Sequence, residues 1–142
     1  MRSRDVAVGV VTAQFTEVWN SGNVDLIPEI YANDFVGHFP DGSIRGHDGI
    51  RDVVTHHRRA FPDWTEQIED LVFEGDRVAV RFSSSGTNRG PNRGKPPTNR
   101  SVQISEMAIY RILDGKIAEQ WVIPDTHSLL QQLYGENTQS AT

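Results

Sequence analysis

The stretch "SVQISEMAIYRILDGKIAEQWVI" runs from Ser101 to Ile123 and contains two strand-like runs separated by Asp114-Gly115. An Asp-Gly pair is a strong signal for a two-residue β-hairpin, because its turn needs positive φ angles. The related pair "GD" at 75–76 separates two further strand-like runs, "WTEQIEDLVFE" and "RVAVRFSSSGT". We therefore predict four antiparallel strands in the second half of the chain, with a long loop rich in Gly, Pro and Arg between the middle two.

The first part of the chain has helical spacing instead. Apolar residues recur at helix-like intervals from Val6 to Trp19 and stop at the sequence "NSGN". The stretch "VDLIPEIYA" predicts a short helix, "DFVGHF" (34–39) a strand, and "PDGSIRG" a turn before a third helix. Helices followed by an antiparallel meander are typical of an α+β domain. We expect one domain over residues 1–135, with "SLLQQLY" as its last helix, and a flexible tail at 136–142.

The composition excludes several classes of function. The net charge of −5 argues against a nucleic-acid-binding protein, and the absence of cysteine excludes thiolate metal sites and cysteine nucleophiles. The histidines show neither HxH nor HExxH spacing, so we expect no metal. Neither GxGxxG nor a P-loop nor GxSxG occurs, which removes dinucleotide, nucleoside triphosphate and serine-hydrolase hypotheses. No stretch approaches about 18 apolar residues, so we expect no membrane association and a cytoplasmic protein.

Glu106 interrupts an apolar row on its predicted strand. The two-residue period of a strand places Val102, Ile104, Ala108 and Tyr110 on the same face as this carboxylate. An isolated buried charge is very costly, so the group must be paired, neutral or facing water. One interpretation is an acid that lines a pocket and has a raised pKa. The other is that this face of the strand meets solvent or an oligomer interface.

The same period places Glu119, Trp121 and Asp125 on one face of the next predicted strand. A large aromatic residue flanked by two carboxylates suits a cavity that stacks a ring and handles a proton. Asp125 also lies just before the last predicted helix, where aspartate is a good N-cap. The two roles are compatible, and capping alone would explain the aspartate.

Two histidines and one loop are further candidates for a site. His57 lies on the apolar stripe of the third predicted helix, and His38 lies among the apolar residues of "DFVGHF". Each is interpreted either as a hydrogen-bonded core or pocket-rim histidine or as a catalytic residue. The loop at 88–100 carries four basic residues, and it is either a solvated hairpin loop or a surface that attracts an anion.

Several stretches occur together in the chain: "AFPDW", "IEDLVFEGDRVAVRF", "GKPPTNR", and "DGKIAEQW" followed by an aspartate and "LLQQL". From roughly Phe15 to Gly135 this pattern resembles the SnoaL-like polyketide cyclase (ester cyclase) family, within the nuclear-transport-factor-2-like superfamily. The resemblance implies a cone-shaped α+β barrel, in which three N-terminal helices pack on a strongly curved antiparallel sheet around a deep apolar pocket. It also implies a homodimer or higher homo-oligomer through the outer sheet face, and ring closure by intramolecular aldol chemistry without metal or cofactor.

The resemblance also implies roles for individual residues. An aspartate that matches Asp125 serves as acid/base in the family's cyclases. On this hypothesis Asp125 removes a proton beside a carbonyl group, and Glu106 within reach would raise one of the two pKa values by repulsion. His57 or His38 would donate to the developing enolate oxygen. The residues expected to bind a small apolar or aromatic substrate are Trp19, Tyr31, Phe39, Tyr110 and Trp121.

The chain departs from the family pattern in three places. It reads "GTN" at 86–88 where the family often reads "GTH", Glu106 stands where many members have a small residue, and Pro124 restricts the backbone before Asp125. Three functions therefore stay open. The first is a cyclase or isomerase acting on a polyketide- or terpenoid-like molecule. The second is an enzyme that opens epoxides or dehydrates with paired carboxylates, and the third is a ligand-binding protein without turnover.

Overall fold

A single open sheet organises the computed structural model, which describes residues 2–136. Within these residues the sheet has six strands in the order β2-β1-β6-β5-β4-β3. Their bounds are β1 Tyr31–Phe39, β2 Gly42–Arg45, β3 Thr65–Glu74, β4 Arg77–Thr87, β5 Ser101–Leu113 and β6 Lys116–Pro124. Neighbouring strands are antiparallel except β1 and β6, which run parallel. The predicted α+β class is confirmed, but the sheet is mixed because its first strand returns beside its last.

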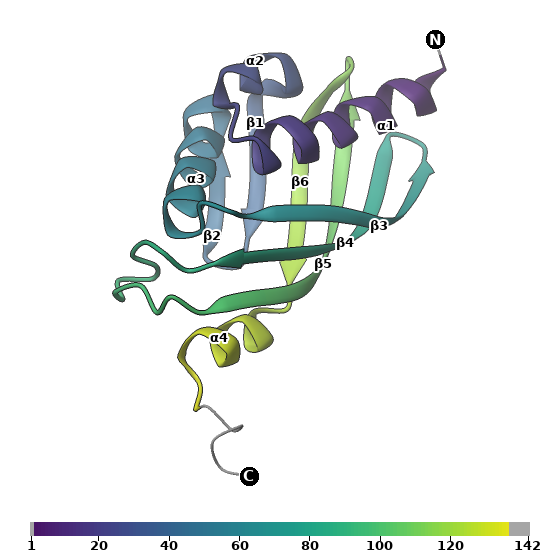
Figure 1. The fold of residues 1–142 in the computed structure, drawn as a ribbon. Helices are drawn as coiled ribbons and strands as arrows, with labels where there is room; N and C mark the ends of the chain where they lie inside the picture. The colour runs from purple at the N-terminus through teal and green to yellow at the C-terminus, as the bar shows by residue number, and fades with distance from the viewer. Residues whose placement is uncertain (1, 137–142) are drawn as a thin grey trace.

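The helices cover one side and the ends of this sheet. Their bounds are α1 Ser3–Ala13, the π-helix η1 Gln14–Asn20, the 3₁₀-helix η2 Val24–Leu26, α2 Ile27–Ile30, α3 Gly46–Ala60 and α4 Thr126–Tyr134. Figure 1 shows α1 lying across the strands, α3 beside β1 and β2, and α4 at the end of the molecule away from α1. None of the helices described is long and apolar enough to cross a membrane.

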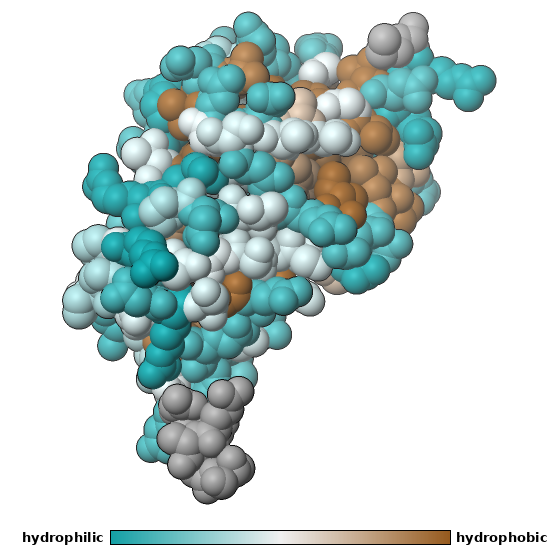
Figure 2. All heavy atoms as spheres, viewed as in Figure 1, coloured by the Kyte–Doolittle hydropathy of each residue, from teal (hydrophilic) through white to brown (hydrophobic). Residues whose placement is uncertain are grey.

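The sheet bends strongly along its width. Figure 1 shows β3 and β4 crossing the direction of β1 and β2, with β5 and β6 making the transition between them. Along β5 burial alternates strictly from Ser101 to Tyr110, so one row of side chains enters the core and the other stays outside. Glu106 belongs to the inner row, which agrees with the first of the two interpretations of its apolar neighbours. In Figure 2 the apolar surface of the visible face gathers below α1, at the end where β3 and β4 join.

Two local predictions in the first half of the chain were incomplete. The stretch "PDGSIRG" begins with the predicted turn at Pro40 and Asp41 but also contains β2, which pairs with β1 in a hairpin where Phe39 lies opposite Gly42. A strand of four residues is too short to show an alternating pattern, and its pairing with β1 is a tertiary property. The predicted second helix also ends early, because Tyr31 already pairs with Ile117 as the first residue of β1.

The prediction that Glu119, Trp121 and Asp125 share a face lining a cavity was also wrong. The pairing of β6 with β5 shifts register, so that Ile117 and Glu119 lie opposite consecutive residues of β5. The extra residue in β6, Ala118, makes a β-bulge. Because side chains alternate with a period of two, one extra residue moves every following side chain to the other face.

The loop between β4 and β5 is tied to the rest of the molecule. Asn88 is fully buried, and its amide donates to the carbonyl oxygens of Ala60 and Gly90 at 3.3 and 2.8 Å. Its Oδ1 accepts from the backbone nitrogen of Thr98 at 2.8 Å. Arg100 donates to carbonyl oxygens at the end of α4. The tail predicted at 136–142 lies outside the described residues, apart from its first residue.

Candidate functional site

A pocket of about 520 Å³ opens between the concave face of the sheet and α3. Its size is typical of a site for a small organic molecule. The larger apolar side chains of its wall are Trp19, Phe39, Phe61, Trp64, Phe82 and Ile104. Of the residues proposed from the sequence, Trp19, Phe39, His57, Glu106 and Tyr110 line this pocket. Their contact with a substrate stays a prediction.

Four carboxyl side chains line the pocket: Asp41 and Asp52 are exposed, whereas Glu66 from β3 and Glu106 from β5 are more enclosed. The indole of Trp64 donates to Glu66 Oε2 at 2.9 Å, and the hydroxyl of Ser84 donates a short hydrogen bond to Glu106 Oε2. Burial raises the pKa of Glu66, and the negative charge of Glu106 raises it further. Burial also raises the pKa of Glu106, while the hydrogen bond from Ser84 opposes that rise. Each of the two enclosed carboxyl groups therefore has one donor that holds it in place.

The two enclosed carboxyl groups titrate as a pair. Burial raises the pKa of both groups, and the negative charge of Glu106 raises that of Glu66 further, so the loss of one proton from the pair makes the loss of the second harder. The pocket can therefore present one carboxylate and one carboxylic acid together, which are the partners needed for acid-base chemistry.

Glu66 was missed in the sequence, although a signal for it exists. In the run "WTEQIED" this glutamate lies two residues from Trp64 and two from Ile68, so it interrupts an apolar row as Glu106 does. The row is short, because the register of β3 shifts between Ile68 and Asp70. The residues that follow Ile68 do not continue the alternation of apolar and polar side chains, so they gave no sign that Glu66 lies on a buried face of β3.

His57 is a neutral histidine in an aromatic setting. Its ring centroid lies 4.2 Å from that of Trp64, in an edge-to-face arrangement. Burial lowers the pKa of His57 to about 4, and the nearby charges of His56 and Arg58 add to the effect. A neutral imidazole has one donor nitrogen and one acceptor nitrogen. His57 can therefore bind a polar group without bringing a charge into the pocket.

Two polar atoms of the pocket wall have no hydrogen-bond partner among the residues that the structure describes. They are Nε2 of His57 and Oε1 of Gln120, and both are buried. Buried polar atoms in folded proteins are nearly always paired. Gln120 faces inward because of the bulge in β6, so the sequence pattern gave no reason to select it. The two atoms suit a ligand that has its own hydrogen-bonding groups.

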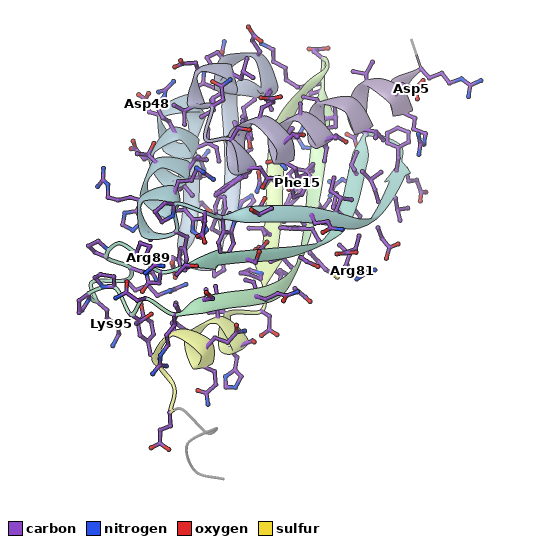
Figure 3. The ribbon with its side chains drawn as sticks, viewed as in Figure 1. Asp5, Phe15, Asp48, Arg81, Arg89 and Lys95 are labelled. Atoms are coloured by element: carbon purple, nitrogen blue, oxygen red, sulfur yellow. The ribbon has the colours of Figure 1, made fainter. Side chains whose placement is uncertain are left out.

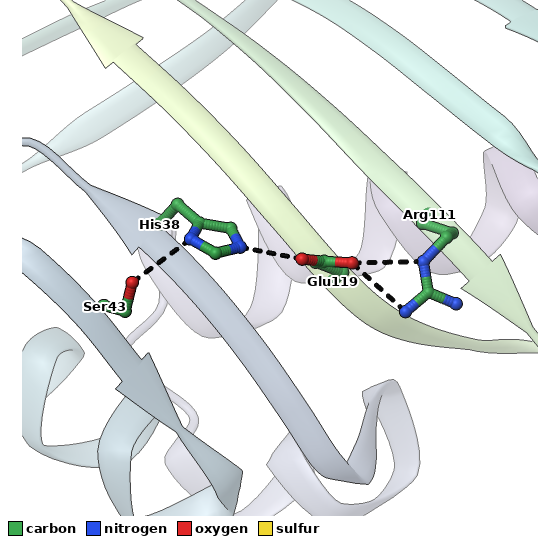
Figure 4. Close-up of polar contacts among 4 residues, drawn as sticks. All are labelled: His38, Ser43, Arg111 and Glu119. Atoms are coloured by element: carbon green, nitrogen blue, oxygen red, sulfur yellow. Dashed lines mark hydrogen bonds and ion pairs between the residues drawn. The ribbon is translucent and has the colours of Figure 1, made fainter.

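Two predicted site residues lie on the outer face of the sheet instead. His38 Nε2 lies 2.7 Å from Glu119 Oε2, and its Nδ1 lies 3.1 Å from Ser43 Oγ (Figure 4). Arg111 donates to the other oxygen of Glu119, and the hydrogen bond with His38 is the main cause that lowers the pKa of this glutamate. Trp121 stacks on His38 at 5.4 Å. The hypothesis that His38 and Trp121 face the cavity is therefore wrong.

Tyr31 and Asp125 also lie away from the pocket wall. Tyr31 is fully buried and donates to Gln14 Oε1 at 3.0 Å. Asp125 is exposed, and its Oδ1 accepts from the backbone nitrogen of Ser128 at 3.0 Å, as an N-cap of α4. The capping role predicted for Asp125 is confirmed. Its carboxylate is not among the groups that line the pocket.

The loop at 88–100 borders the mouth of the pocket. Arg93 of this loop and Asp41 of the β1–β2 turn both line the opening, and their side chains approach to 3.4 Å. Figure 3 shows Arg89 and Lys95 on the same loop, below α3 in the view. Part of the loop therefore contributes to the pocket wall. Among residues 2–136, no group of three or more His, Asp and Glu side chains is placed to hold a metal ion.

Comparison with known proteins agrees with this architecture. The sequence model of a family described as SnoaL-like polyketide cyclase matches residues 9–133. The aklanonic acid methyl ester cyclase DauD of Streptomyces sp. strain C5 is 26% identical over 127 residues, which cover 84% of this chain and 77% of the relative. IdmH of Streptomyces antibioticus superposes with a TM-score of 0.76 at 29% identity, over 89% of this chain and 96% of the other. A protein of Jannaschia sp. CCS1 shares the fold with a TM-score of 0.87, at 22% identity and 94% coverage of both chains.

Proposed function

The chain belongs to the SnoaL-like polyketide cyclase family, and from this premise we propose that it is a cofactor-independent cyclase or isomerase of polyketide- or terpenoid-like molecules. The observation that carries the proposal is the pair of enclosed carboxyl groups, Glu66 and Glu106, whose pKa values are raised by burial in a largely apolar pocket. The relative DauD supports the class of reaction, because it is named as a cyclase of a methyl ester.

The proposed reaction is an intramolecular aldol closure. The carboxylate of Glu106 removes a proton from a carbon beside a carbonyl group, which leaves an enolate. The enolate carbon attacks a second carbonyl carbon of the same molecule, and a carbon–carbon bond forms. The alkoxide produced takes a proton from the carboxylic acid of Glu66. One proton enters the pair and one leaves it, so the product is an isomer of the substrate.

The surroundings of the pair suit this chemistry. A carboxylate with a raised pKa is a stronger base than a free glutamate, and burial is the main cause of the rise here. The aromatic walls formed by Trp19, Trp64 and Phe82 can hold a flat molecule by stacking and edge contacts. The unpaired atoms of His57 and Gln120 would bind polar substituents of that molecule.

The proposal is tested by deuterium uptake from deuterated water into a panel of cyclic and acyclic 1,3-dicarbonyl compounds. We expect the wild type to accelerate uptake above background. Glu106→Gln should reduce the acceleration by about 100-fold or more, because it removes the general base and keeps the shape. Asp125→Asn should stay within about twofold of the wild type, because asparagine caps a helix as well as aspartate does.

The same panel can contradict this assignment. Loss of uptake in Asp125→Asn together with full uptake in Glu106→Gln would place the base at Asp125, as the family resemblance implies. Absence of uptake in the wild type over the whole panel would count against carbon-acid chemistry. Thermal unfolding of each variant serves as the control that the fold is intact.

The carboxyl pair also supports a second candidate function, the opening of an epoxide or the dehydration of an alcohol. In that reaction Glu106 would activate water or accept a proton, and the acid form of Glu66 would protonate the leaving oxygen. Incorporation of oxygen from ¹⁸O-labelled water into the product would identify epoxide hydrolysis. Ligand binding that survives Glu106→Gln, with no product from the wild type, would indicate a binding protein without turnover.

We also propose that the chain forms a homodimer through the outer face of the sheet. Met107, Ile109 and Ile123 are 58, 40 and 76% exposed on this face. Met107 lies opposite Ile123, and Ile109 lies opposite Trp121 on the neighbouring strand, so the side chains form a continuous patch. Adjacent exposed apolar residues on a sheet face are typical of a protein–protein interface. A second copy of the chain presents the same patch, which suits a twofold interface.

A further inference from the structure

A buried glutamine links the N-terminal helix to the pocket. Gln14 is fully buried at the start of the π-helix η1. Its Oε1 accepts from the hydroxyl of Tyr31 at 3.0 Å, and its Nε2 donates to the hydroxyl of Tyr110 at 3.2 Å. The chain of hydrogen bonds joins residues 96 positions apart in the sequence. Short π-helical segments are frequent at functional sites, and this one lies next to the pocket through Trp19.

The direction of these hydrogen bonds follows from the chemistry of the Gln14 amide. Its oxygen can only accept and its NH2 group can only donate. Tyr31 therefore gives its own proton to Oε1 of Gln14. This contact fixes the amide, and Nε2 is the group that Gln14 turns toward Tyr110.

Tyr110 consequently receives a hydrogen bond from Gln14 and keeps its own proton available. Among the described residues Gln14 is its one side-chain hydrogen-bond partner, and Tyr110 lines the pocket. Burial raises the pKa of Tyr110 well above its ordinary value, and the charges of Glu66, Tyr31 and Glu106 add to the rise. The phenol thus stays neutral and can act as a hydrogen-bond donor over the whole neutral pH range.

The same π-helix also holds the backbone of Glu66, one member of the carboxyl pair. Asn20 Oδ1 accepts from the backbone nitrogen of Glu66 at 2.6 Å, and Asn20 Nδ2 donates to the backbone oxygen of Glu66 at 3.0 Å. Trp19, which precedes Asn20, lines the pocket. The seven residues of η1 therefore contribute Trp19 to the pocket wall and fix the backbone of Glu66. Through Gln14 they also orient the phenol of Tyr110.

We propose that Tyr110 is a catalytic residue that donates a hydrogen bond to the substrate oxygen on which negative charge develops, and that Gln14 is the positioning residue that directs it. The proposal rests on the proposed function, because this oxygen is the enolate oxygen formed when Glu106 removes a proton. A donor fixed in advance stabilises the developing charge without reorganisation. No bond to Tyr110 breaks, since its proton stays on the phenol while the charge forms and disappears.

The test measures the binding of a series of substituted 2-naphthols of similar size and different acidity, whose oxygen resembles an enolate oxygen. Affinity is followed by fluorescence at one pH, and its dependence on naphthol acidity is the readout. For the wild type we expect affinity to increase with acidity. Tyr110→Phe should remove this dependence, so that the most acidic naphthol loses about tenfold or more and the least acidic loses little.

Two further variants test the positioning role. Gln14→Met removes the hydrogen bonds and keeps the volume, and Tyr31→Phe lets the Gln14 amide turn its oxygen toward Tyr110. Neither Gln14 nor Tyr31 lines the pocket, so both should weaken the acidity dependence without removing a wall residue. In the deuterium-uptake assay Tyr110→Phe should lower kcat by about 100-fold with KM nearly unchanged.

Phe35→Leu is the matched control. The ring of Phe35 packs on Tyr31 at 4.8 Å and takes no part in the hydrogen bonds. This variant loosens the same part of the core, and it should weaken all naphthols equally. An acidity dependence that persists in Tyr110→Phe overturns the donor role, and a dependence that persists in both Gln14→Met and Tyr31→Phe overturns the positioning role. Acidity-dependent binding by a protein that shows no deuterium uptake would keep the Tyr110 donor and reject the cyclase.

Discussion

Ser84 controls the pH at which Glu106 becomes a base. The Ser84 hydroxyl donates to the carboxylate of Glu106, which stabilises the ionised form against the effect of burial. We predict that Ser84→Ala raises the pKa of Glu106 further, so the rise of activity with pH moves to higher pH by up to about one unit. The pH profile of deuterium uptake measures this shift. An unchanged profile would show that ionisation of Glu106 does not limit the reaction.

His57 should make the protein sensitive to acid. Burial lowers the pKa of His57 from its ordinary value of 6.5 to about 4 in the folded chain, so between these pH values the unfolded chain binds a proton and the folded chain does not. The stability is therefore complete above pH 6.5 and is lost as the pH falls toward 4, by at most about 3 kcal/mol. We predict that His57→Asn has a smaller loss between pH 7 and 4.5 in urea unfolding. His127→Asn, at an exposed position, should keep the wild-type loss.

At the scale of elements, the loop between β4 and β5 depends on one side chain. The NH2 group of Asn88 donates to the carbonyl oxygens of Ala60 and Gly90, and its side-chain oxygen accepts from the backbone nitrogen of Thr98. Asn88 therefore joins the beginning of the loop to its end. We predict that Asn88→Ala lowers the free energy of unfolding by roughly 2–3 kcal/mol, because it leaves buried backbone groups without partners. Asn88→Asp keeps the acceptor for Thr98 but brings a buried charge, and it should also destabilise. Chemical denaturation measures both, and an unaffected Asn88→Ala would show that the loop orders without this residue.

The β-bulge in β6 decides which side chains of this strand enter the pocket and which lie on the outer face of the sheet. Without Ala118 as an extra residue, Glu119 and Trp121 would point into the cone and Gln120 would point out. With it, Gln120 enters the pocket, and Trp121 stacks on His38 outside. The sequence shows the alternation of β6 but contains no Gly or Pro that would indicate a bulge at this position.

At the scale of the whole molecule, the outer face of the sheet should control assembly. We predict that Ile123→Lys converts a dimer into a monomer, because it places a charge in the middle of the apolar patch on β5 and β6. Size-exclusion chromatography with light scattering measures the mass. Leu113→Lys is the control, since Leu113 is 55% exposed but lies at the β5–β6 turn. A wild-type monomer, or a dimer that persists in Ile123→Lys, would contradict this interface.

Local pattern in the sequence determined much of the fold. The Asp114-Gly115 turn has positive φ at both residues, as the hairpin prediction required. Of the two interpretations of the apolar row around Glu106, the structure agrees with the acid that lines a pocket, and the position of Asp125 predicted a helix cap. Each of these depends on residues within a few positions of one another, and such short-range relations are visible in a sequence.

The tertiary structure alone decided which side chains meet in the pocket. Glu66 faces the same cavity as Glu106 because the sheet curls until β3 and β5 border one space. Gln14 reaches Tyr110 across 96 positions, and Gln120 turns inward through a bulge that exists only in the pairing with β5. Alternation along a strand repeats every two residues and carries no information on the partner strand, the bulge or the curvature. The sequence therefore determined most of the strands and helices and one of the two carboxyl groups, and the packing of the curved sheet brought the site together.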